Sequence, residues 1–152
     1  IMGACVVAAM AAWAIEQHPM DAVVAAGLGE ADHLAGLYAL APAALEPIRQ
    51  AASGEWVPEA GRPSDAVGTL ASVLHVLRGA TGLAAAMKHA VAMGGDTDTA
   101  AALVGGIIGC RLEHVENDIS WLSKVGLPET EKVDTMASGL YELRKSPYAG
   151  TG

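Results

Sequence analysis

Apolar residues recur along most of the chain at spacings of three and four, and polar or helix-breaking residues separate these stretches. Between Val67 and Leu77, for example, the apolar positions fall on one face of a helix. The residue types that favour strands, β-branched and aromatic, form no alternating run of useful length. The pattern predicts an all-α fold arranged as a compact multi-helix bundle.

Proline and glycine set the expected helix boundaries. The first helix is expected to stop at His18-Pro19, and the pair Gly94-Gly95 is expected to break another. Ser64 is expected to cap the helix that follows the longest irregular stretch. The expected helices span about residues 2–17, 20–39, 42–52, 64–77, 82–93, 97–111, 121–126 and 128–145.

Composition agrees with a helical core. Hydrophobic residues make up 52% of the 152 residues, which is enough for a sizeable core, whereas aromatic residues make up only 4% and Phe is absent. Alanine favours helices, and small side chains let helices approach one another closely. The length fits one domain, or one piece of a larger domain.

The chain is acidic, with nine Lys and Arg against seventeen Asp and Glu and a net charge of -8. Such a surface repels phosphate backbones, so we expect neither nucleic acid nor an anionic membrane among its partners, whereas divalent cations are attracted. Cys5 and Cys110 lie in apolar segments without the spacing of a metal or redox motif. They indicate buried thiols in a reducing compartment, and hence a cytoplasmic protein.

The apolar opening Ile1–Ile15 mimics a signal peptide but lacks the positively charged region that begins one. It is also shorter than the roughly 20 residues that span a bilayer. We interpret it as a buried core helix. Because a natural chain rarely begins inside such a helix, we expect further residues upstream of Ile1.

The residues with most chemistry lie between two predicted helices. Gly94 and Gly95 allow a sharp turn, and Asp96, Asp98 and Thr99 then place three oxygen-bearing side chains in the first turn of the next helix. Two carboxylates and a hydroxyl suit a hard cation such as Mg²⁺. The alternative is purely structural, with Asp96 as an N-cap and Asp98 complementing the helix dipole. The stretch is not a calcium-binding EF-hand loop, and its two carboxylates would repel a bare phosphate.

This string, Gly-Gly-Asp-Thr-Asp-Thr at residues 94–99, resembles the C-terminal metal motif of the ADP-ribosylglycohydrolase family. Its surroundings also resemble that family. Residues 61–78 are similar to the loop and helix that precede the motif, and residues 101–110 to the Gly-rich helix that follows it. Trp121 stands where family members usually place a tryptophan.

The resemblance implies an all-α bundle of the family's type and a Mg²⁺-dependent hydrolase. Such an enzyme cleaves the glycosidic bond that links ADP-ribose to a modified protein or small molecule. By the same resemblance, Asp96, Asp98 and Thr99 are expected metal ligands in a site for two Mg²⁺ ions, with Mn²⁺ as an alternative ion. Asp98 is the residue expected to bridge the two ions.

The family's remaining ligands, a Thr-Asp-Asp cluster, and in some members a catalytic Glu belong to its N-terminal half. Neither a Thr-Asp-Asp nor an Asp-Asp string occurs in this sequence. We therefore expect residues 1–152 to be the C-terminal portion of a single helical domain that supplies half of a binuclear site. A missing N-terminal segment or a partner chain would supply the other half and the catalytic residues, none of which is assigned here.

Two other functions stay open at this point. A non-catalytic relative, crystallin-like or binding, would keep the fold without the reaction. A Mg²⁺- or Mn²⁺-dependent phosphate-transfer protein would use an Asp-x-Asp pair, but the nucleotide-binding strand and loop that it needs are not visible in the sequence.

Several residues have both a functional and a structural interpretation. In the stretch from Ser53 to Pro63, Glu55, Trp56 and Glu59 can border a ligand cleft, with Trp56 stacking on adenine or, alternatively, anchoring the loop. The five histidines lack the spacing of a zinc protease and are expected to cap helices, face solvent or pack in the core; they are His18, His33, His75, His89 and His114.

Overall fold

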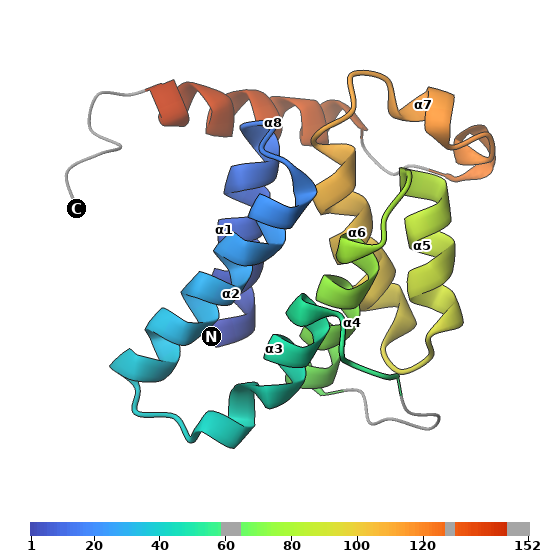
Figure 1. The fold of residues 1–152 in the computed structure, drawn as a ribbon. Helices are drawn as coiled ribbons and strands as arrows, with labels where there is room; N and C mark the ends of the chain where they lie inside the picture. The colour runs from blue at the N-terminus through green and yellow to red at the C-terminus, as the bar shows by residue number, and fades with distance from the viewer. Residues whose placement is uncertain (59–64, 127–129, 146–152) are drawn as a thin grey trace. The chain divides into compact units, whose positions relative to one another are not determined.

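The computed structural model describes residues 1–58, 65–126 and 130–145. Throughout these ranges the regular secondary structure is helical, which confirms the all-α prediction (Figure 1). The chain divides into two compact units, residues 1–119 and 120–152. The first holds α1 (Met2–Ile15), α2 (Met20–Leu37), the 3₁₀ helix η1 (Pro42–Leu45), α3 (Glu46–Ser53), α4 (Ala66–Arg78), α5 (Leu83–Ala92), α6 (Thr97–Gly109) and α7 (Val115–Asp118); the second holds the 3₁₀ helix η2 (Leu122–Lys124) and α8 (Thr130–Lys145).

Most helix boundaries lie within about two residues of those predicted; two points differ, and one predicted boundary cannot be compared. The sequence pattern does not predict α7, a single turn without periodicity. Ser64 lies outside the described residues, and the N-cap of α4 is Asp65, whose carboxylate accepts a hydrogen bond from the backbone N–H of Gly68 at 2.8 Å. The predicted start of the last helix at Pro128 lies outside the described residues, and α8 is described from Thr130.

Helices α1 and α2 form a tightly packed pair, visible side by side in Figure 1. The pair depends on Gly27, because a Cβ atom built there would approach the Met10 side chain to 2.7 Å. At the turn between the two helices, Arg111 donates a hydrogen bond to the backbone oxygen of His18. Gln17 likewise donates to the carbonyl of Cys110 at 3.4 Å. These bonds tie the α1–α2 turn to the end of α6.

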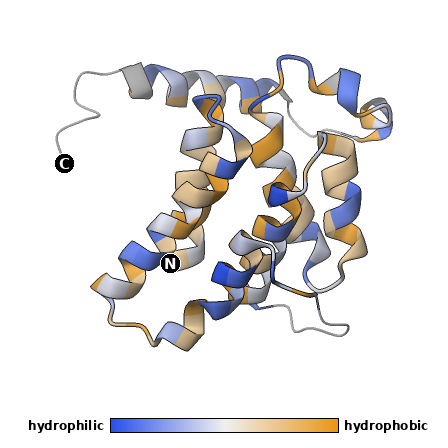
Figure 2. Cartoon of the chain, viewed as in Figure 1, coloured by the Kyte–Doolittle hydropathy of each residue, from blue (hydrophilic) through white to orange (hydrophobic). Residues whose placement is uncertain are grey.

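Helix α4 lies at the centre of this unit and packs against α1, α2, α3, α5 and α6. Among the described residues, the only buried polar side chain is that of Ser72 in α4. Its hydroxyl donates a hydrogen bond to the Gly68 carbonyl at 2.8 Å. Figure 2 shows hydrophobic residues along much of α6, which packs on α4. Among the largest fully buried side chains are Met10, Leu45, Ile48, Val73, Leu74, Leu77, Val104 and Ile107.

Helices α5 and α6 also form a close pair. A Cβ atom at Gly105 would lie 3.4 Å from the Met87 sulfur, so Gly105 serves helix packing, as its sequence spacing suggests. The N-terminus of α5 is capped from a distance, because Asp118 accepts hydrogen bonds from the backbone N–H groups of Leu83 at 2.5 Å and Ala84 at 3.2 Å. Asp118 therefore joins α7 to the start of α5.

The turn from α5 into α6 consists of Gly94 and Gly95, each with φ of 76°. Residues with a Cβ atom rarely adopt this left-handed conformation, so the turn requires glycine. The turn places Asp96 at the N-cap of α6. The helix break predicted at Gly94-Gly95 is thus confirmed. No helix in the described residues is long and apolar enough to cross a membrane.

The strain at this turn can be measured by replacing Gly94 with Ala. Nothing lies within 4 Å of the added Cβ atom, so the cost comes from the positive φ alone and should lower the free energy of unfolding by about 1–2 kcal/mol. Gly106→Ala is the matched control, because Gly106 lies in helix α6 with equally open space around it. This substitution should raise the free energy of unfolding by roughly 0.5–1 kcal/mol. Urea unfolding compares the two, and equal midpoints would contradict the requirement for glycine.

Candidate functional site

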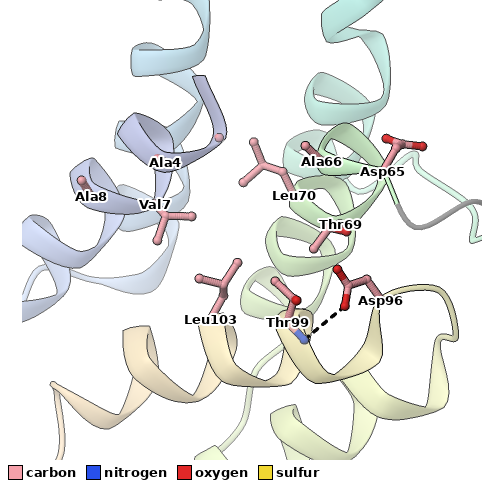
Figure 3. A pocket seen from close by; sticks show the side chains of 11 residues that line it. Ala4, Val7, Ala8, Asp65, Ala66, Thr69, Leu70, Asp96, Thr99 and Leu103 are labelled. Carbon is pink, nitrogen blue, oxygen red and sulfur yellow. Dashed lines mark hydrogen bonds between the residues drawn. The ribbon is translucent and has the colours of Figure 1, made fainter. Parts of the chain in front are cut away.

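A cavity of about 600 Å³ opens beside the start of α6 (Figure 3). The N-terminal halves of α1, α4 and α6 form its walls. Small and apolar side chains make up most of the lining, and oxygen-bearing side chains come from α4 and α6. The lining residues are Gly3, Ala4, Val7, Ala8, Asp65, Ala66, Thr69, Leu70, Asp96, Thr99 and Leu103.

Asp96 is both a helix cap and a cavity residue. Its carboxylate accepts a hydrogen bond from the backbone N–H of Thr99, but at 3.4 Å this bond is long. The capping role considered from the sequence is therefore correct. Figure 3 shows the Asp96 side chain directed into the space beside Thr69, so the cap does not turn the carboxylate away from the cavity.

Asp98 is fully exposed in the first turn of α6 and is not among the described residues that line the cavity. Its pKa is lowered, first by hydrogen bonding to the Asp96 side chain and then by backbone hydrogen bonds at Thr99 and at Asp98 itself. The two carboxyl groups are thus neighbours. One of the three predicted ligands lies beside the cavity, and the other two, Asp96 and Thr99, line it.

The donor set suits Mg²⁺, because it consists of carboxylate and hydroxyl oxygens, the ligands that this ion prefers. Within the described ranges, no three or more His, Cys, Asp or Glu side chains form a cluster that could hold a metal ion. Mg²⁺ is usually held by one or two carboxylates together with water and substrate oxygens, and Asp96, Asp98 and Thr99 fit that smaller contribution.

The α4 side of the cavity holds two residues that sequence reasoning did not assign to a site. Asp65 caps α4 through Gly68, and in Figure 3 its carboxylate points away from Asp96. Thr69 lies one turn further along and faces the Asp96 side chain. The only sequence signal for them was their place in the first turns of a helix, which does not reveal that α4 and α6 begin beside the same cavity.

The loop and histidine candidates have structural positions. Trp56 is only 8% exposed and meets the ring of His75 edge-on, with centroids 5.5 Å apart, which agrees with the loop-anchoring interpretation. The ring of His75 also meets the ring of His89 edge-on, with centroids 5.7 Å apart. Glu55 is exposed, and Glu59 lies outside the described residues. Trp56 and Asp65 also line a second cavity of about 310 Å³, so the loop borders a hollow next to the first one.

The interaction between Asp96 and Asp98 predicts how the pKa of Asp98 responds to substitution of Asp96. Replacing Asp96 with Ala should raise the pKa of Asp98 toward its ordinary value of 3.8, because the largest cause of the lowering is removed. In the unaltered protein, the stabilisation from ionised Asp98 is present above that value and is lost as the pH falls through the lowered pKa. NMR titration of the Asp98 carboxyl carbon measures the pKa of Asp98 in the unaltered protein and in the Asp96→Ala variant. Asp96→Asn is the control, because its amide, unlike the Ala side chain, can donate a hydrogen bond to the Asp98 carboxylate; equal pKa values of Asp98 in the two variants would contradict the assignment.

Comparison with known proteins gives one family. The family model described as ADP-ribosylglycohydrolase matches residues 1–150. Neither a search of curated proteins nor a search of solved structures returns a match. The family match covers nearly all of the 152 residues and agrees with the all-helical fold and with the motif at the start of α6. The chain belongs to the ADP-ribosylglycohydrolase family.

Proposed function

We propose that this chain takes part in the Mg²⁺-dependent hydrolysis of the glycosidic bond between ADP-ribose and a modified protein or small molecule. Family membership supports a glycohydrolase-type enzyme in general. The observation that carries the finer proposal is the place of Asp96 and Thr99, which line a cavity large enough for a small ligand.

Asp96, Asp98 and Thr99 would have different roles because they occupy different positions at the cavity. Asp96 and Thr99 offer oxygens to the cavity, and Asp98 adds an exposed carboxylate beside Asp96. Together they would hold Mg²⁺, or Mn²⁺ in its place, in a site for two ions. When bound, the metal would orient sugar hydroxyls and polarise water. The apolar wall from Val7, Leu70 and Leu103 would exclude bulk water from one side of the sugar.

The chain supplies part of the site in this proposal. Hydrolysis of a glycoside requires an acid or base beside the leaving oxygen, and we assign none among the described residues. A segment upstream of Ile1 or a partner chain would provide the catalytic residues and the remaining metal ligands. Cys5 is half-buried and Cys110 is exposed, so the prediction of two buried thiols is wrong. A cytoplasmic location belongs to the same proposal.

The central test uses the complete protein with Asp98 replaced by Asn. Release of ADP-ribose in the presence of Mg²⁺ should fall by about 10- to 100-fold or more, because the loss of a direct ligand costs no less than the loss of a supporting partner. Asp134→Asn, at an exposed position in α8, is the control and should retain full turnover. Unchanged turnover in Asp98→Asn would end the assignment, and a wild-type protein without any release would favour a non-catalytic relative.

A second test addresses the shared site. Calorimetry of the 152-residue chain alone should show only weak Mg²⁺ binding, because the described residues bring together no more than two carboxylates and a hydroxyl, without a cluster of three or more His, Cys, Asp or Glu side chains. Adding the complementary segment or chain should tighten the binding. Tight stoichiometric binding by the 152 residues alone would show that the site is complete without a partner.

A further inference from the structure

Thr69 is the polar residue of α4 that faces the metal motif. It lies in the first turns of α4, where its backbone N–H donates to the Asp65 carbonyl at 2.9 Å. Its side chain lines the cavity together with Asp96 and Thr99, and Figure 3 shows it directed toward Asp96. Thr69 is partly buried, so a ligand in the cavity can reach its side chain without exposing the helix core.

The hydroxyl of Thr69 has no bond within its own helix. Serine and threonine in helices commonly donate to the carbonyl four residues back. Ser72 does so to Gly68 at 2.8 Å, and Thr135 does so to Glu131 at 2.8 Å. No described residue forms a hydrogen bond with the Thr69 hydroxyl, and the same holds for the hydroxyl of Thr99. Two hydroxyls are therefore available at one side of the cavity.

The charges of the cavity restrict what these groups bind. None of the described lining residues is basic, and two are carboxylates, so the lining offers no direct partner to a phosphate group that no cation accompanies. The opposite wall, from Val7 and Leu103, is apolar. A compact ring with an apolar face and neutral hydroxyls fits both walls. A sugar hydroxyl can donate to the Asp96 carboxylate and accept a hydrogen bond from Thr69 at the same time.

We propose that Thr69 is a ligand-binding residue that holds a sugar hydroxyl against the Asp96 carboxylate and so sets the position of the sugar in the cavity. The proposal rests on the function proposed above and adds α4 to the site.

The test uses the complete protein and two hydroxyl-free variants, Thr69→Val and Thr69→Ala, so that one unfolded variant does not remove the evidence. Each should bind ADP-ribose roughly 3- to 10-fold more weakly, as expected for one lost hydrogen bond. Thr69→Ser keeps the hydroxyl and should restore wild-type affinity, which a purely structural role for the methyl group would not do. Calorimetry with ADP-ribose at constant Mg²⁺ measures the affinities.

Thr81→Val is the matched control, because Thr81 is exposed in the turn before α5 and lines a different cavity. It should bind as the wild type does. Wild-type affinity in both hydroxyl-free variants, or an equal loss in Thr69→Ser, would overturn the role of Thr69 while the proposed function stands. A wild-type protein that neither binds nor releases ADP-ribose would overturn both.

Discussion

The site depends on where α4 and α6 begin relative to each other. Apolar packing between these helices places both N-terminal turns at one cavity, and α1 closes the third side. The packing brings Thr69 to face Asp96, although the two residues are far apart in the sequence. The left-handed turn at Gly94 and Gly95 then gives α6 its direction and leaves Asp96 at its start. The burial of apolar side chains thus determines where the side-chain oxygens of Thr69, Asp96 and Thr99 lie.

Small residues explain how the cavity stays open. Gly3, Ala4 and Ala8 line the cavity from α1 together with Val7, and larger side chains at the three small positions would fill part of it. Elsewhere small residues serve close contact instead, as Gly27 does against Met10 and Gly105 against Met87. The alanine- and glycine-rich composition therefore serves both close helix packing and an unfilled pocket at the ends of the helices.

The sequence predicted the helices well and the site in part. Proline, glycine and apolar spacing predicted most boundaries, because these signals act locally. The one-turn helix α7 has no periodicity, and Asp118 joins it to α5 over 35 residues, which no local pattern reveals. The motif pointed to Asp96, Asp98 and Thr99, but Thr69 carries no sequence signal of its own. Its role depends on long-range packing, and the presence of Mg²⁺ remains a prediction from family resemblance.

Anomalous scattering from Mn²⁺ in crystals of the complete protein tests directly whether the start of α6 binds metal. Metal density should appear within coordination distance of the Asp96 and Asp98 carboxylates and the Thr99 hydroxyl, at the edge of the cavity that α4 also lines. Density at other residues only, or none while Asp96 remains bound solely to the start of its own helix, would contradict this prediction.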